Sequence, residues 1–203
     1  QDAESHHWWT WAMSTVWETW AELTRFLESA RLAFARERTL WQSLELANRE
    51  GARLKVRVGK GWYKTRLDQH VQAVLNEEIL YASVLIHSYA LAESAAMDAL
   101  ALNRAPGGIE EWGCRLLTQA GAEWANVRDG EAGAVEVAVV RNAFAHGTRR
   151  IDTLASKRLS EAGAPHRPAG TEVTLSYEEL RTYRGRLASL LNEGGLQRRL
   201  SGT

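Results

Sequence analysis

A long run of sequence without glycine or proline constrains the fold of this chain most. It extends from about Trp8 to Arg49 and ends at Glu50-Gly51. Apolar residues within it recur in alternating steps of four and three, with one interruption at Glu37. This spacing places a heptad stripe on one face of a helix. We therefore expect one long helix whose apolar stripe must be covered by another surface. The stripe consists of Trp9, Met13, Val16, Trp20, Leu23, Leu27, Ala30, Phe34, Trp41 and Leu44.

A short basic segment follows the expected helix. The sequences ARLKVRV and WYKTRLD flank Gly59-Lys60-Gly61, and apolar-polar alternation around such a turn predicts a β-hairpin. Its charge fits either a solvated surface or a contact surface for an RNA backbone, and the sequence leaves both interpretations open. The basic residues are Arg53, Lys55, Arg57, Lys60, Lys64 and Arg66.

The rest of the chain predicts an antiparallel helical bundle. A second long helix is expected from about Gln69 to Asn103, and because it is apolar almost all round, it should lie at the centre. Two further helices are expected at Ile109–Val127 and from about Ala134 to His146. A long polar connection follows, ending in TEVTLS, which predicts a short strand or an extended lead-in.

A capping box predicts the start of the last helix. Ser176 and Glu179 have the spacing of this motif, and the helix should run from Tyr177 to about Asn192. The tail LQRRLSGT should be frayed. The fold class is therefore mainly α, an antiparallel bundle with a long N-terminal helix and a small β-hairpin. We expect the divisions 1–50, 51–68 and 69–203.

Composition narrows the class of protein. The chain has 25 basic and 25 acidic residues, so contact with nucleic acid must come from a local patch. A single cysteine, Cys114, excludes a disulfide framework and a multi-thiolate zinc site. No apolar run approaches the roughly 18–20 residues of a membrane span, and the start lacks the layout of a secretory signal. We expect a cytoplasmic protein with no metal, no cofactor and no membrane contact.

The segment VVRNAFAHG carries the candidate chemistry. Arg141 precedes His146 by five residues, with Asn142 directly after the arginine and Gly147 directly after the histidine. An arginine can hold phosphate oxygens, and an imidazole can exchange a proton at neutral pH. RNA cleavage by its own 2′-hydroxyl needs a proton acceptor and charge stabilisation, but no metal.

This segment resembles the signature of the HEPN superfamily, in which an arginine followed by a polar residue precedes a histidine near the end of a helix in an all-α bundle. The resemblance covers about residues 70–193 and includes Glu93 in SYALAES. It implies a metal-independent endoribonuclease with a toxin–antitoxin or anti-phage defence role, whose products carry a 2′,3′-cyclic phosphate and a 5′-hydroxyl.

The resemblance also implies roles for individual residues. Arg141 and His146 would be catalytic, Asn142 would bind the substrate or fix His146, and Glu93 would orient either member of the pair. Basic residues that follow the motif are candidate RNA-binding residues, and they fit a solvated loop equally well. They are Arg149, Arg150, Lys157 and Arg158.

A single copy of the motif makes a poor site. Five residues along a helix advance about 7.5 Å and turn about 500°, so Arg141 and His146 diverge by roughly 140°. Members of the family pair two copies around a two-fold axis, which implies a homodimer with a composite site. An antitoxin or defence-system protein is a further partner that the resemblance suggests. The tyrosine that many members carry two positions after the histidine is Thr148 here, so silencing through that tyrosine is not expected.

A second interpretation stays open. Arg141 and His146 also fit a surface arginine and a histidine at a helix C-terminus, where the dipole favours a cation. Glu93 also fits a structural carboxylate paired with a basic neighbour. The chain would then be a non-catalytic RNA-binding or protein-interaction module. Helical spacing favours packing over base stacking for the N-terminal tryptophans, Trp8, Trp9, Trp11, Trp17 and Trp20.

Overall fold

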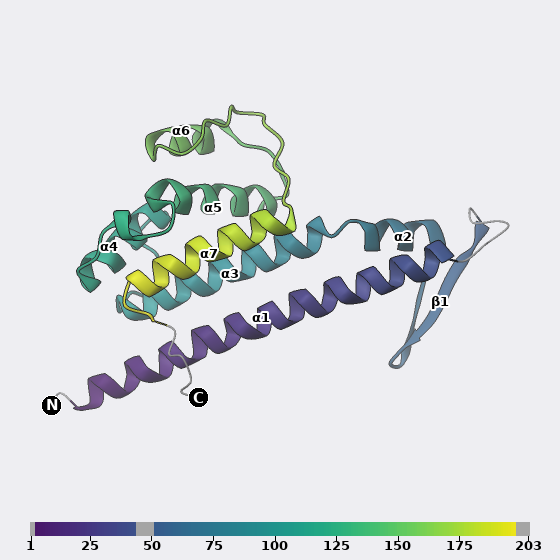
Figure 1. Ribbon diagram of the computed structural model, residues 1–203, viewed down its shortest axis with the longest axis horizontal. Coiled ribbons are helices and arrows are strands. Elements are labelled where there is room, and N and C mark those ends of the chain that lie inside the picture. Colours follow the sequence, from purple (N-terminus) through teal and green to yellow (C-terminus); the bar gives the residue numbers. More distant parts are fainter. Residues whose placement is uncertain (1–2, 44–50, 198–203) are drawn as a thin grey trace. The chain divides into compact units, whose positions relative to one another are not determined.

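The computed structural model describes the backbone of residues 3–43 and 51–197, and the side chains of residues 16–43 and 51–197. This part of the chain is mainly helical with one two-stranded antiparallel sheet (Figure 1), as the sequence predicts. In chain order the elements are α1 (Ala3–Ser43), β1 (Arg53–Val58), β2 (Gly61–Arg66), α2 (Leu67–Leu75), α3 (Glu78–Ala99), α4 (Ile109–Ala120), the 3₁₀ helix η2 (Trp124–Asn126), α5 (Gly130–Ala145), α6 (Thr153–Glu161) and α7 (Tyr177–Glu193).

The chain groups into two compact units. One contains residues 1–23 and 81–203, and the other contains residues 24–80. Helix α1 contributes to both units. The three-part division into 1–50, 51–68 and 69–203 stays a prediction.

The predicted stripe of α1 matches the burial of its described residues. Val16 and Leu27 are 3% and 2% exposed, whereas Phe26, which lies off the stripe, is 57% exposed. Trp17 is also buried, and its indole Nε1–H donates to the carbonyl of Leu196 at 2.8 Å. Val16 and Leu27 of the stripe therefore pack within the chain. Leu44, the predicted helix end at Arg49 and the end of the tail lie outside the described residues, as do the side chains of Trp8, Trp9 and Trp11.

Helix α5 forms the middle of the first unit. It contacts α4, α6 and α7, and Figure 1 shows it between α6 and α7. Val137 and Val140 on α5 are fully buried, as are Leu180 and Leu190 on α7. Burial of apolar side chains is the main favourable term in folding, so this contact fixes the helix that carries the arginine and histidine of the motif.

The expectation of one helix from Gln69 to Asn103 is wrong, because the helix is interrupted at Asn76. Helix α2 ends there with φ −91° and ψ 77°, and α3 begins at Glu78. Asparagine favours such positions since its short polar side chain competes with the backbone for hydrogen bonds. Glu77 lies in the break and pairs with Arg38 of α1 within the second unit.

Two other helices differ from the expected bounds. Helix α4 ends at Ala120 rather than Val127, because Gly121 adopts the left-handed conformation with φ 71°. A 3₁₀ turn at η2 occupies part of the remaining segment. Helix α5 begins at Gly130, one turn earlier than expected, and ends at Ala145.

The polar connection before the last helix contains a helix that the sequence analysis missed. Asp152 caps α6 by accepting a hydrogen bond from the N–H of Ala155 at 2.7 Å, and Leu159 is buried. Of the two alternatives expected at TEVTLS, a short strand or an extended lead-in, the structure has the lead-in, with a single antiparallel bridge between Arg150 and Glu172. The predicted capping box of α7 is confirmed, with Ser176 and Glu179 each accepting from the other's backbone N–H.

Helix α3 qualifies the expectation about membrane spans. Among the described residues it alone is long and apolar enough to cross a membrane by length and composition, and 44% of its apolar window is buried in the structure. Leu85, Ala92 and Ala96 are fully buried along its length. A core helix of a bundle has this composition, so the hydropathy of α3 is explained by packing.

Candidate functional site

The guanidinium of Arg141 is held without a carboxylate. Its Nη1–H donates to Oδ1 of Asn142 at 2.8 Å, and its central carbon lies 4.9 Å from the ring centroid of Tyr89 on α3. No ion pair involves it within the described part of the chain, and its buried Nε has no hydrogen-bond partner there. A guanidinium stacked on an aromatic ring keeps its full charge, so Arg141 is equipped to bind an anion.

The ring of Tyr89 supports the guanidinium of Arg141. It is 5% exposed and packs edge to face with Trp112 of α4, with ring centroids 6.3 Å apart. Burial raises the pKa of Tyr89 to about 12, and the nearby carboxylate of Glu93 acts in the same direction. The phenol is therefore neutral at physiological pH and serves as a platform rather than as a base.

His146 ends the helix that carries Arg141. Its backbone N–H bonds to the carbonyl of Asn142 at 3.0 Å, and Gly147 then adopts the left-handed conformation with φ 69°. The N–H of Arg149 closes the helix end by bonding to the carbonyl of Ala143 at 3.0 Å. The His146 residue is exposed, and its imidazole has no hydrogen-bond partner among the described residues. It is open to a substrate.

Glu93 lies one helical turn after Tyr89 and is half-buried. Its charge affects the phenol of Tyr89, as does the charge of Arg141, so both groups lie near the same ring. No hydrogen bond or ion pair joins Glu93 to Arg141 or His146 in the described residues. Glu93 therefore lies near the ring of Tyr89, as Arg141 does, but does not contact Arg141 directly.

Two of the four candidate RNA-binding residues are engaged in ion pairs. Arg158 forms a two-pronged pair with Glu110 of α4, at 3.1 Å from Nε and 2.8 Å from Nη2. Lys157 lies 3.5 Å from Glu161 on the exposed face of α6. Arg158 therefore fixes α6 to α4, which is a structural role that the sequence analysis did not assign.

The other two candidates lie directly after the helix. The guanidinium of Arg149 lies 5.6 Å from the ring centroid of Phe144, and its backbone has φ 49°. Arg150 is exposed and forms the backbone bridge to Glu172. Both place positive charge close to His146 in the sequence.

Tyr89 is a functional residue that was not predicted from the sequence, although it lies in the segment SYALAES. The available signal was its spacing of four residues from Glu93, which places both side chains on one face of α3. Glu110 was not predicted either, because the sequence offers no signal for it beyond a position in the first turn of α4.

A second polar cluster lies on the other side of α5. The buried carboxylate of Glu136 pairs with Arg167 and with Arg186, and the hydroxyl of Tyr183 donates to it at 3.4 Å. Asp129 completes the cluster by accepting from Arg186 at 2.8 Å. Because each charge is paired, this cluster joins α5, α7 and the connection before α7 and offers no free group for chemistry.

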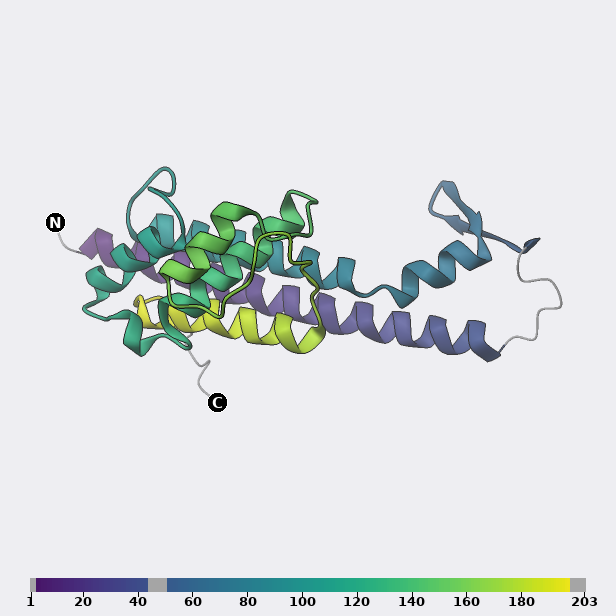
Figure 2. The ribbon, with the colours of Figure 1, turned by 90° about the horizontal axis from the view of Figure 1, so that it is seen from above.

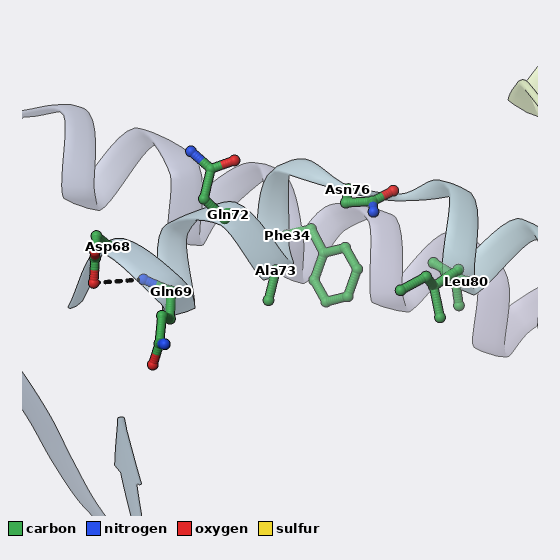
Figure 3. A pocket seen from close by; sticks show the side chains of 8 residues that line it. Phe34, Asp68, Gln69, Gln72, Ala73, Asn76 and Leu80 are labelled. Atoms are coloured by element: carbon green, nitrogen blue, oxygen red, sulfur yellow. Dashed lines mark hydrogen bonds between the residues drawn. The ribbon is translucent and has the colours of Figure 1, made fainter. Parts of the chain in front are cut away.

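A hollow within the second unit involves none of these residues. It has a volume of about 700 Å³, and Figure 3 shows the ring of Phe34 in it beside Ala73 and Leu80. Its one carboxylate, Asp68, is already paired with Arg66 at 2.6 Å. In residues 16–43 and 51–197, no group of three or more His, Cys, Asp and Glu side chains could hold a metal ion.

Comparisons with known proteins place this chain in no group. A scan against protein-family models, a search of curated proteins and a search of solved structures each gave no match. The structure defines the class only as a mainly helical protein with a small antiparallel hairpin. Any function must therefore be argued from the site itself.

Proposed function

We propose that this protein is a metal-independent endoribonuclease of the HEPN type with a toxin–antitoxin or anti-phage defence role in the cytoplasm. One observation carries the proposal. Arg141, fixed by Tyr89 and Asn142 but paired with no carboxylate, lies on the same helix end as the exposed imidazole of His146. A fixed cation and an accessible imidazole are the two groups that this cleavage requires, and because the two side chains diverge around the helix, a second copy of the chain would bring them together in one cleft.

The chemistry balances without a further reactant. The 2′-oxygen of a ribose attacks the adjacent phosphorus, and His146 accepts the proton that the hydroxyl loses. The bond between phosphorus and the 5′-oxygen breaks, and that oxygen takes a proton from water to leave as a hydroxyl, while the imidazolium of His146 returns its proton to the solvent. Arg141 stabilises the negative charge that builds on the phosphate oxygens. The products are a 2′,3′-cyclic phosphate and a 5′-hydroxyl.

The supporting residues have distinct roles in this proposal. Asn142 orients the guanidinium of Arg141 through the 2.8 Å hydrogen bond. Glu93 adds negative charge near Tyr89 and helps to orient the cationic group above that ring. Arg149 and Arg150 attract the RNA backbone next to His146.

Cleavage of a mixed RNA pool in excess chelator tests the proposal. We expect the native chain to cut RNA, and Arg141→Ala and His146→Ala each to reduce the rate by at least about a hundredfold, as the loss of a general base or of charge stabilisation does. Arg104→Ala and His166→Ala are matched controls, since both residues are exposed and lie outside the site. Equal cleavage by the native chain and either site variant would reject the assignment.

A non-catalytic module is the second candidate function. It is favoured by the engagement of Arg158 with Glu110, which removes one expected RNA contact and gives it a structural role. In that case the native chain would bind RNA or a partner protein without cutting it. The same assay distinguishes the two candidates, because a non-catalytic module would release no cyclic phosphate from the RNA pool.

A further inference from the structure

The two strands of the hairpin separate their side chains into two different faces. Directly opposed residues of an antiparallel pair point to the same side of the ribbon. The register pairs Leu54 with Thr65, Val56 with Tyr63 and Val58 with Gly61 on one side. The other side, which we call the cationic face, pairs Arg53 with Arg66, Lys55 with Lys64 and Arg57 with Trp62. Five of its six side chains are therefore basic.

The cationic face is open to solvent and short of counter-charge. Every one of its six residues is exposed. Within the described residues only Arg66 forms an ion pair, with Asp68. Like charges placed directly opposite each other on neighbouring strands destabilise a hairpin, and Lys55 faces Lys64 in this way. A bound polyanion would remove that repulsion.

Contacts on the opposite side of the hairpin hold it against α2. The ring of Tyr63 packs against His70 of α2 with centroids 6.0 Å apart, and Nε2 of His70 lies 2.8 Å from a carboxylate oxygen of Glu37 on α1. The N–H of Leu67 donates to the carbonyl of Ala52 at 2.9 Å and closes the base of the hairpin. Figure 2 shows that the β-hairpin continues directly into α2. All of these residues belong to the second unit. Because Tyr63 contacts α2 from the opposite side of the hairpin, the cationic face points away from α2.

The exposed ring of Trp62 indicates which kind of polyanion fits the cationic face. It is 56% exposed on the cationic face, and Nζ of Lys55 lies 4.5 Å from the centroid of its ring. Basic residues interleaved with an exposed aromatic ring are the arrangement that binds single-stranded nucleic acid, because the cations contact phosphates while a base stacks on the ring. A lipid surface would require the cations and a free apolar side together, but part of the apolar side is occupied by α2.

We infer that the cationic face of the hairpin is a second RNA-binding surface, which holds single-stranded RNA through its phosphates and one stacked base without reading its sequence. The choice of RNA as the polyanion rests on the proposed function. Phosphate contacts carry affinity but no sequence information, so binding should depend strongly on salt.

Fluorescence anisotropy with a labelled 2′-O-methyl oligouridine tests the inference, since this probe has no free 2′-hydroxyl and cannot be cut by the proposed reaction. We expect Lys55→Gln/Lys64→Gln to weaken binding on the order of tenfold at moderate salt and to lower the slope of log K against log salt by about 1.4, or about 0.7 for each lost phosphate contact. This variant removes a like-charge pair, so it should not unfold the hairpin.

Matched variants complete the test. Arg104→Gln/Arg115→Gln removes the same charge from exposed positions in the first unit and should leave binding unchanged. Trp62→Leu should weaken binding several-fold, whereas Trp62→Phe should retain it because a ring remains for stacking. Unchanged binding by Lys55→Gln/Lys64→Gln would overturn the inference, as would binding of the native chain to anionic lipid vesicles but not to the oligouridine.

The outcomes for the hairpin and for the proposed function are separable. Hairpin-dependent binding without any cleavage of natural RNA would reject the endoribonuclease while supporting the RNA surface. Cleavage that depends on His146, together with oligouridine binding that does not depend on Lys55 and Lys64, would reject the RNA surface while supporting the endoribonuclease.

Discussion

Arg141 shows how a charged side chain can be fixed in place and still keep its charge available. A carboxylate partner would hold it equally well, but would compete with a phosphate for the same guanidinium. The ring of Tyr89 and the amide of Asn142 give it position without a negative charge. Glu136, on the same helix, is the opposite case, because its carboxylate is paired with two arginines.

Replacing Tyr89 tests whether the ring positions the arginine. We expect Tyr89→Leu to lower the rate of RNA cleavage about tenfold, since a partly desolvated cation–π contact contributes on the order of 1–2 kcal/mol. Tyr89→Phe should cleave at nearly the native rate because the ring remains. Thermal unfolding of both variants provides the control for stability. Equal rates for Tyr89→Leu and Tyr89→Phe would contradict the role of the ring.

At the scale of elements, α6 shows how a short helix in a polar connection becomes ordered. Nine residues are too few for a stable isolated helix, so tertiary contacts must hold it. The buried side chain of Leu159 and the ion pair between Arg158 and Glu110 provide them. Asp152 adds an N-terminal cap.

The pair between Arg158 and Glu110 predicts a dependence of stability on pH. Burial raises the pKa of Glu110, but the hydrogen bonds from Arg158, a backbone hydrogen bond and the charge of Arg158 together outweigh it and hold this pKa below the usual 4.5. A carboxylate whose pKa is lowered in the folded state stabilises it above the unfolded pKa, and that contribution is lost as the pH falls through the folded value. We expect Glu110→Gln to reduce the free energy of unfolding at pH 7 and the difference from the native chain to shrink below pH 4.5.

Urea unfolding at pH 7 and at about pH 3.5 measures this difference. Glu111→Gln is the matched control, because the neighbouring Glu111 forms an exposed pair with Arg115 within one helix. Exposed pairs of this kind contribute little, about 0.5 kcal/mol or less. A loss of stability in Glu110→Gln that is the same at both pH values would show that the ion pair is not its cause.

At the scale of the whole molecule, the proposed activity requires more than one chain. Arg141 and His146 are separated by more than one turn of α5 and diverge around its axis by roughly 140°. A two-fold arrangement would place both copies of the pair in one cleft. Val16 and Leu27 of the α1 stripe are already buried within one chain, so these two side chains are not available for this contact.

Analytical ultracentrifugation tests this requirement. We expect a dimer at micromolar concentration, and cleavage activity per chain that falls when dilution dissociates it. The charge control Arg104→Gln/Arg115→Gln should sediment like the native chain. A monomer with full activity would contradict the composite site.

The sequence by itself determined the local features of this protein. The heptad spacing predicted the stripe of α1, glycine at position 59 and alternation predicted the hairpin, and Ser176 with Glu179 predicted the start of α7. Local rules suffice in these places because the deciding contacts lie within a few residues along the chain. The class of fold follows from them.

Only the tertiary structure decided which charged groups are free. Arg141, Arg158 and Arg167 are all arginines of the first unit, yet Arg158 and Arg167 are paired with carboxylates while Arg141 stacks on Tyr89. Their partners Glu110 and Glu136 lie 48 and 31 residues away in the sequence. The order of α6 likewise depends on contacts with distant segments, because packing and ion pairing between remote residues override local preference.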